Sequence, residues 1–493
     1  MERPFRPKFL KEIWDAIDPQ GGPPLQSEGL EAQALARPVL HVGILIALAV
    51  VYYFAHIGAK VLEGDEATYA LLSKTIAMTG DWGRLALNGE PYLRKPPLYF
   101  WLTAGLFQFL PISGFSASVV SSLFGVADTL LVYALCRVMF PGWVTAFASS
   151  LAYLTTHEVL HWSRGVHLET LVTFWLLLGL LAVYWSVRRP AATALVGAAL
   201  AGGWLSKGVQ GLYPALILAL VWMKERILFR RLLSIWGVII VCLFGVAVAS
   251  WIWIGGDDAK VFIEGYLVRQ VGAKLFSSLV PHHGYWWYFR LLLATYWPWL
   301  PAAVIGIILL ARSWRSSVGS RVWLLFAAVV IVAILLTTEK RSRYLFQLYP
   351  VLSVASGIAL ARWARRFPRL PSLLVGLTLV GAVALGIFGG RRSAPAGKTA
   401  DTVLIAARLE ARPVRPVLIT GQTQHGRPRV GRILGFYAAP LLRTCKARCL
   451  EEAVPGSTIV TRADEADQVA AAVGGRVAYG NGTLAIVVVP EKS

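Results

Sequence analysis

The chain has 493 residues, of which 56% are hydrophobic and only 15% are charged. Soluble domains carry about a quarter charged residues, so this composition excludes an ordinary soluble protein. The formal net charge of +21 points to nucleic acid, anionic lipid or an anionic substrate as a partner. Because the basic residues stand in short loops between apolar segments, nucleic acid is disfavoured and a polytopic, all-α membrane protein is predicted.

Residues 1–37 are polar and lack the apolar core of a signal peptide, so they are expected to form a cytoplasmic tail. A membrane domain is expected over 38–390, with about eleven transmembrane helices and possibly thirteen. The expected spans are residues 38–57, 115–138, 142–160, 168–187, 191–206, 209–223, 232–254, 288–310, 321–338, 343–361 and 371–389.

Two loops between these spans are long, at 58–114 and 255–287. The first contains a helix-like stretch from Asp65 to Thr79 and an apolar stretch from Pro97 to Leu110, which is expected to lie along the membrane interface. Residues 396–493 are polar and mixed. Strand-like runs at 417–420, 458–461 and 484–489 and a helical pattern at 464–473 predict a small α/β domain outside the membrane.

The distribution of basic residues predicts the orientation. With the N-terminus in the cytoplasm, the cytoplasmic loops carry most of the arginines, as the positive-inside rule requires. The same orientation places nearly all acidic residues at the outer face, which would be the periplasmic face of a bacterial inner membrane. Asp128 alone sits inside a span, where it is either a functional acid or a polar contact between helices.

Adjacent carboxylates at the outer end of the first span are the first candidates for chemistry. Asp65 and Glu66 would suit a general base and a hydrogen-bond acceptor for a hydroxyl substrate. Alternatively, Asp65 is only the N-cap of the helix that follows it. Glu169 is a further acid at an outer helix end.

Cations at the same face are candidates for binding an anion. Lys340, Arg341 and Arg343 break the positive-inside rule, and arginines bind phosphate through two hydrogen bonds. Arg94 and Lys95 precede a double proline and an aromatic run. Each of these groups, like Lys207 at another outer helix end, has the simpler interpretation of contacting lipid headgroups.

Histidine and cysteine give weaker signals. His157 and His161 have the spacing of one helix face and could bind a metal with Glu158 or Glu169, but such pairs are commonly polar contacts, and no metal site is predicted. Cys445 and Cys449 are either a disulfide or two free thiols.

Several motifs together indicate a family. The segments Gly64-Asp65-Glu66-Ala-Thr-Tyr69, Gly80-Asp81-Trp82, Asn88-Gly89-Glu90-Pro91-Tyr92 and Lys95-Pro96-Pro97-Leu98 closely resemble the first external loop of bacterial GT-C glycosyltransferases. These include lipid A aminoarabinose transferases and relatives of dolichyl-phosphate-mannose protein mannosyltransferases. Ser206-Lys207-Gly208, Lys340-Arg341-Ser-Arg343-Tyr344 and Leu348-Tyr349-Pro350 also look like motifs of this family.

The resemblance implies an inverting transfer of a sugar from a polyprenyl (undecaprenyl) phosphate carrier to an envelope acceptor, which would be lipid A or core sugar, another glycan or a protein hydroxyl. It implies that Asp65 is the catalytic base, with Glu66 and Glu169 beside it. The residues expected to bind the donor phosphate or lipid are Tyr92, Arg94, Lys95, Lys207, Lys340, Arg341, Arg343 and Tyr344. Tyr69, His282 and His283 are expected to contact substrate. No cofactor is assigned, and a divalent metal is left open.

Two residues depart from the family pattern. Arg94 stands where aminoarabinose transferases usually have an acid, and Glu169 stands where relatives often have Asp. The sugar and the acceptor are therefore left open. A transporter or flippase of lipid-linked sugars is the alternative, and it predicts charged residues along a path through the membrane. A non-catalytic scaffold predicts no special role for Asp65 or the outer cations.

Overall fold

The computed structural model describes residues 38–223, 230, 232–265, 286–336, 340–388, 398–410, 417–420, 430–438, 442–445, 453–481 and 483–490. Helices dominate the part before residue 390. They are α3 (Pro38–Phe54), α6 (Gly114–Met139), α7 (Trp143–Leu154), α8 (His157–Ser163), α9 (Glu169–Ser186), α10 (Ala192–Lys207), η1 (Gly208–Leu212), α11 (Tyr213–Trp222), α13 (Ile235–Gly265), α15 (Trp286–Thr295), α16 (Leu300–Arg312), α17 (Val318–Leu336), η3 (Ser342–Leu348), α18 (Tyr349–Ala364) and α19 (Leu370–Phe388).

The helices confirm a multi-pass membrane protein. Among the described residues, six helical stretches are long and apolar enough to cross a membrane, or seven if the bent pair α15–α16 counts as one span. Three shorter apolar helices, Pro38–Phe54, Trp143–Leu154 and Leu370–Leu385, accompany them. The count of eleven spans stays a prediction.

Three expected spans are not single straight helices. The span expected at 142–160 is divided into α7 and α8 at Thr155 and Thr156, whose hydroxyls donate to carbonyls of the preceding turn. The span expected at 288–310 bends by 113° between α15 and α16. Pro298 lies in that bend, and proline lacks the N–H that a continuous helix needs. The helix expected to end at 254 continues to Gly265 after a break at Gly256, where φ is 55°.

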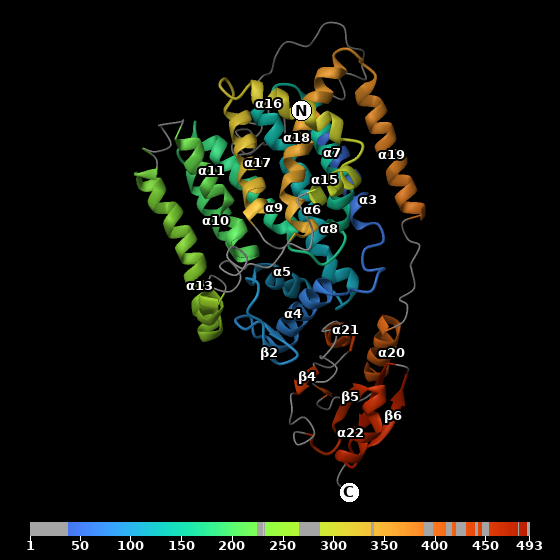
Figure 1. The fold of residues 1–493 in the computed structure, drawn as a ribbon. Coiled ribbons are helices and arrows are strands. Elements are labelled where there is room, and N and C mark those ends of the chain that lie inside the picture. The colour runs from blue at the N-terminus through green and yellow to red at the C-terminus, as the bar shows by residue number, and fades with distance from the viewer. Residues whose placement is uncertain are drawn as a thin grey trace, which may run out of the picture.

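The membrane helices pack into one bundle (Figure 1). Helix α6 packs against α3, α7 and α9, while α9 packs on α10 and α10 on α13; α18 packs on α7 and α16. Helix α10 ends just before Gly208, where φ is 71°, and the chain then folds back on α10. The backbones of Gly203 and Gly211 touch so closely there that neither position has room for a Cβ atom. Lys207 therefore lies at the end of a helical hairpin.

The first loop forms a layer at one end of the bundle, below it in Figure 1. It comprises α4 (Asp65–Thr79), the two-residue strands β1 (Ala86–Leu87) and β2 (Glu90–Pro91), and α5 (Leu98–Leu106). Gly80 ends α4 in the left-handed region, with φ at 70°. Asn88 and Gly89 both have positive φ, as the tight Asn-Gly turn of a hairpin requires. The expected helix at Asp65–Thr79 is confirmed, and the expected interfacial stretch contains the shorter helix α5.

The C-terminal segment contains a five-stranded mixed sheet. Its elements are α20 (Lys398–Glu410), β3 (Val417–Thr420), α21 (Val430–Tyr437), β4 (Leu442–Cys445), β5 (Thr458–Arg462), η5 (Ala463–Glu465), α22 (Ala466–Ala472), β6 (Arg476–Gly480) and β7 (Leu484–Val488). The strand order is β4-β3-β5-β7-β6. Strand β3 pairs in parallel with β4 and β5, whereas β7 pairs antiparallel with β5 and β6.

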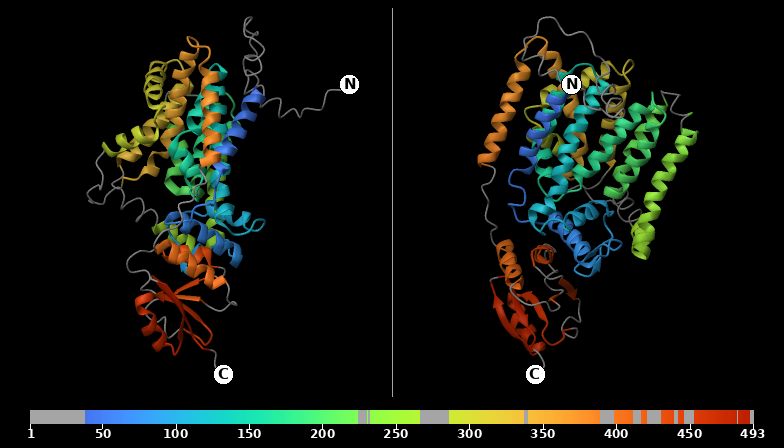
Figure 2. Two further views of the ribbon diagram at one scale, coloured as in Figure 1. Left: turned by 90° about the vertical axis from the view of Figure 1, so that its right-hand side faces the viewer. Right: turned by 180° about the vertical axis from the view of Figure 1, so that it is seen from behind.

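Alternation along the central strands gives this sheet two apolar faces. Val460 and Ile486 pack against α20 and α21, while their neighbours Ile459 and Val487 pack against α22. In each view of Figure 2 the sheet lies beyond the first-loop layer, at the same end of the bundle. Strand runs at 417–420, 458–461 and 484–489 coincide with β3, β5 and β7.

Candidate functional site

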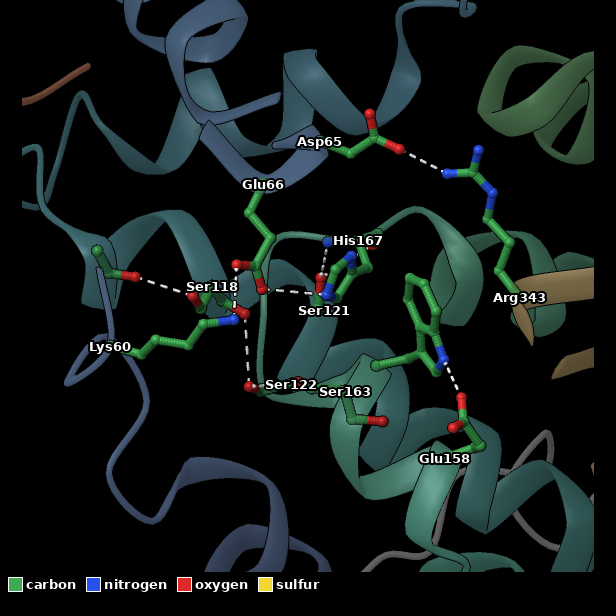
Figure 3. Close-up of polar contacts among 12 residues, drawn as sticks. Lys60, Asp65, Glu66, Ser118, Ser121, Ser122, Glu158, Ser163, His167 and Arg343 are labelled. Carbon is green, nitrogen blue, oxygen red and sulfur yellow. Dashed lines mark hydrogen bonds and ion pairs between the residues drawn. The ribbon is translucent and has the colours of Figure 1, made fainter. Parts of the chain in front are cut away.

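Asp65 and Arg343 form an ion pair between two motifs that lie far apart in the sequence. The Nη1 atom of Arg343 donates to Oδ2 of Asp65 across 2.6 Å (Figure 3). Asp65 is the first residue of α4, and Arg343 comes from η3. The Asp65 side chain is 47% exposed, so a substrate has access to it.

Asp65 does not cap α4. The N-cap residue is Gly64, and no side-chain hydrogen bond caps the helix. Asp65 and Glu66 instead occupy the first turn, where negative charge complements the partial positive charge of a helix N-terminus. The interpretation of Asp65 as an N-cap is therefore wrong.

Glu169 and Lys207 form a second, buried ion pair. The Nζ atom of Lys207 donates to Oε1 of Glu169 across 2.9 Å, and these side chains are only 6% and 3% exposed. Glu169 begins α9 and Lys207 ends α10, so both charges also suit the dipoles of their helices. A buried pair of this kind holds both groups in one geometry, because separating them would leave a desolvated charge.

Glu66 lies on the other side of α4 from Asp65, in a buried position (Figure 3). Its Oε1 atom lies 3.1 Å from Nε2 of His167, and its Oε2 atom accepts from Nζ of Lys60 at 3.3 Å. Burial alone would raise the pKa of Glu66, but His167 and Lys60 outweigh burial and lower this pKa to about 2. Glu66 is therefore ionised at any physiological pH.

The His167 loop is fixed by serine hydroxyls of α6. The Oγ atom of Ser121 donates to the backbone carbonyl of His167 at 2.9 Å and accepts from its backbone N–H at 3.0 Å. Gly165 faces the carboxylate of Glu66, and a Cβ atom there would stand 2.3 Å from Oε1. Close approach of the loop to Glu66 thus depends on a glycine.

Two buried tyrosines, Tyr69 and Tyr92, lie within electrostatic range of Asp65 and Arg343. Burial raises the pKa of the Tyr69 hydroxyl well above its ordinary value; the charges of Asp65 and Glu169 raise it further, and Arg343 lowers it. Burial likewise raises the pKa of Tyr92. Both hydroxyls therefore remain protonated, and Tyr69 lies within electrostatic range of both ion pairs.

The remaining expected phosphate ligands are more dispersed. Arg94 is exposed, Lys95 is partly buried, and the charge of Arg94 acts on the Tyr92 hydroxyl. The Nζ atom of Lys340 donates to the backbone carbonyl of Ile334 in α17 at 3.1 Å. The backbone N–H of Arg341 donates to the Tyr288 hydroxyl at 3.2 Å.

Tyr344 packs at the edge of the main apolar core. His282, His283 and Cys449 lie outside the described residues, so the possible pairing of Cys445 with Cys449 stays a prediction.

Sequence reasoning did not assign His167, Lys60 or Gly165 to the site. His167 stands two residues before Glu169, and that proximity was the only available signal. Asp128 is not part of the site: its Oδ2 atom accepts from the Tyr153 hydroxyl at 3.3 Å, a polar contact between α6 and α7. Glu158 accepts from the indole of Trp162. In the described part of the chain, no three His, Cys, Asp or Glu side chains are grouped to hold a metal ion.

Comparison with known proteins gives consistent matches. Residues 94–253 match the family model described as dolichyl-phosphate-mannose-protein mannosyltransferase. Undecaprenyl phosphate-alpha-4-amino-4-deoxy-L-arabinose arabinosyl transferase 1 of Pseudomonas fluorescens is 23% identical over 360 residues, which cover 70% of this chain and 62% of that protein. The corresponding transferase of Erwinia tasmaniensis is 24% identical over 319 residues, covering 62% of this chain and 56% of that protein. The matched region spans about three fifths of the length of these relatives.

Solved structures show the same fold. The crystal structure of ArnT from Cupriavidus metallidurans bound to undecaprenyl phosphate superposes with a TM-score of 0.73 at 17% identity, covering 93% of this chain and all of that one. An oligosaccharyltransferase of Archaeoglobus fulgidus, in complex with zinc and sulfate, matches with a TM-score of 0.56 at 14% identity over 88% of this chain and 69% of that one. The chain is therefore a multi-pass membrane protein of the GT-C glycosyltransferase fold that is similar to the aminoarabinose transferases, as its motifs indicated.

Proposed function

We propose that the chain is an inverting glycosyltransferase that takes a sugar from a polyprenyl phosphate carrier, with undecaprenyl phosphate as the carrier. The observation that carries this proposal is the ion pair of Asp65 and Arg343, because it places an accessible carboxylate beside a cation suited to phosphate. The names of the similar transferases, and the undecaprenyl phosphate bound to ArnT, support the same donor class.

In this reaction a hydroxyl of the acceptor attacks the anomeric carbon of the donor sugar. Asp65 takes the hydroxyl proton while the bond from that carbon to the phosphate oxygen breaks. The bonding electrons stay on the phosphate, and Arg343 and Lys207 stabilise the charge that develops there. Attack from the side opposite the leaving phosphate inverts the configuration.

The other site residues have supporting parts in the proposal. Glu169 fixes Lys207 and lies near the reacting groups, and Glu66 holds the first turn of α4 through His167. Tyr69, with its protonated hydroxyl, is a hydrogen-bond donor to the sugar or the phosphate. Tyr92, Arg94, Lys95, Lys340, Arg341 and Tyr344 would surround the lipid phosphate, and His282 and His283 would contact substrate.

The proposed setting is the periplasmic face of a bacterial inner membrane, since the arginine-rich loops then face the cytoplasm. Residues 1–37 would be a cytoplasmic tail, 38–390 the catalytic membrane domain, and 396–493 a periplasmic domain. The acceptor would be an envelope glycolipid, glycan or protein hydroxyl.

The test is sugar transfer in reconstituted vesicles that contain a panel of undecaprenyl phosphate sugars and an envelope extract. We expect Asp65→Asn to lower the rate about 10²–10⁴-fold, the usual contribution of a general base. Asp81→Asn is the matched control, because Asp81 is an exposed acid of the same loop that accepts only turn hydrogen bonds in the contacts seen here. If wild type and Asp65→Asn move lipid-linked sugar across the bilayer but transfer none of it, the chain is a transporter instead.

A further inference from the structure

Helix α21 of the C-terminal segment lies against α4, the helix whose first residues are Asp65 and Glu66 (Figure 1). Lys74 of α4 forms the main polar contact between the two helices. The Nζ atom of Lys74 donates to the carbonyls of Gly435 and Phe436 at 3.1 Å each, and also to the carbonyl of Ala438. These carbonyls lie at the C-terminal end of α21, where helix carbonyls have no partner within the helix.

The position of Lys74 is matched to an ammonium group. The residue is buried, with 3% of its surface exposed, and burying an unpaired ammonium would cost several kcal/mol. An ammonium has three N–H donors, and the end of a helix carries a partial negative charge. Two carbonyls of α21 and that of Ala438, just after the helix, therefore compensate the desolvation of Lys74.

A second contact reaches the chain just before Asp65. The backbone N–H of Leu62 donates to the Tyr437 hydroxyl at 3.0 Å. Ile433 and Phe436 of α21 belong to the same apolar core as Tyr69. Helix α21 thus holds the acid-bearing segment on both sides, at Leu62 before the acids and at Lys74 after them.

The fit between the two helices is close. At Gly435 an added Cβ atom would stand 2.6 Å from Oδ1 of Asn88 and 2.8 Å from Cδ2 of Leu71. A Cβ atom there would have to displace the Asn88 amide or the Leu71 side chain, which is almost fully buried on α4. Gly435 therefore permits the close approach of α21 to the first loop.

We infer that Lys74 is a positioning residue, which locks α4 onto α21 so that Asp65 stays aligned with Arg343 and Glu66 with His167. This inference rests on the proposed function for its effect on catalysis. It assigns the C-terminal segment a part in sugar transfer, although the ion pairs seen at the site among the described residues all join residues of the membrane domain.

The test compares Lys74→Met with Lys74→Arg, which keeps a cation with several donors. Hydrogen–deuterium exchange of residues 62–72 reports the order of the acid-bearing segment without needing any activity. Steady-state kinetics then separate kcat from KM for the donor. For Lys74→Met we expect at least tenfold faster exchange of residues 62–72, a kcat lowered at least tenfold and a donor KM within about twofold of wild type. Lys74→Arg should recover part of both effects.

A glycine pair provides the second approach, should Lys74→Met fail to fold. Gly435→Ala adds a Cβ atom on the α21 side of the contact with α4 and should reproduce both effects. Gly376→Ala in α19 is its matched control, because a Cβ atom there meets nothing within 4 Å. Unchanged exchange of residues 62–72 in Lys74→Met and Gly435→Ala would overturn the inference. If these variants exchange faster but the wild type transfers no sugar, the proposed function is refuted while the contact between α4 and α21 stays established.

Discussion

Asp65 and Glu66 are adjacent residues with different surroundings. The helical turn directs Asp65 to Arg343 at an accessible position and Glu66 into a buried site beside His167 (Figure 3). The exposed carboxylate can exchange its partner for a substrate, whereas the buried one cannot do so without a large desolvation cost. This difference supports the proposal that Asp65 is the base and that Glu66 holds the segment in place.

The low pKa of Glu66 has a consequence for stability. Its folded pKa of about 2 lies below the ordinary value of 4.5, so the ionised group stabilises the fold. That stabilisation is complete above pH 4.5 and is lost as the pH falls toward 2. We therefore expect the Tm of wild type to exceed that of Glu66→Gln at pH 6 and the difference to shrink below pH 4.5. A difference that stays constant from pH 6 to pH 3 would contradict this assignment.

Gly165 offers a second prediction. Alanine there would place a Cβ atom 2.3 Å from Oε1 of Glu66 and 2.7 Å from Nε2 of His167, so the carboxylate and the ring would have to move apart. We expect Gly165→Ala to lose about 1–3 kcal/mol of stability, the usual effect of overpacking, and to lower the transfer rate at least tenfold. Gly105→Ala in α5 is the control, because a Cβ atom there meets nothing within 4 Å. Equal thermal unfolding and equal transfer rates for the two variants would show that the loop accommodates a Cβ atom at position 165.

The residues that sequence reasoning identified and those it missed differ in kind. Asp65 and Arg343 stand in recognisable motifs, and Arg343 departs from the positive-inside rule in the predicted orientation. His167 and Gly165 are ordinary residues of a short loop, and they matter because Ser121 of another helix fixes that loop beside Glu66. Such contacts between distant segments have no periodicity or spacing that a single sequence reveals.

At the scale of elements, α9 and α10 are antiparallel neighbours joined at one end by Glu169 and Lys207. Lys207→Met would leave the carboxylate of Glu169 buried without this cation, at a cost of about 3–5 kcal/mol. The double variant Lys207→Met with Glu169→Gln removes both charges, so we expect it to regain most of the stability and none of the transfer activity. Thermal unfolding in detergent and the vesicle assay measure the two effects. A double variant no more stable than the single one would argue against a coupled pair.

Helix positions were predictable from apolar runs, but their breaks were less so. Pro298 was a visible signal for the bend between α15 and α16. Thr155 and Thr156 carry no comparable signal, so α7 and α8 were expected as one span. Helix α21 was not expected at all, because its eight residues are too few to show a helical pattern.

At the scale of the molecule, helix α4, which begins with Asp65 and Glu66, lies between the helix bundle and the C-terminal sheet (Figures 1 and 2). The proposed orientation predicts that both the site and the C-terminus face the periplasm. Alkaline phosphatase fused after Ser493 should be active, because it folds only outside the cytoplasm. The same enzyme fused after Ser316, in the exposed loop between α16 and α17, should be inactive. The reverse pattern would invert the assigned topology.

The pairing of Asp65 with Arg343 also bears on the order in which substrates bind. The structure pairs the proposed base with the proposed phosphate-binding cation. In the proposed mechanism the arriving phosphate would draw Arg343 away and free the carboxylate, so an acceptor that came first would find no base to receive its proton. The expected kinetics are an ordered sequential mechanism with the lipid donor leading, in which an unreactive acceptor analogue inhibits uncompetitively with respect to the donor.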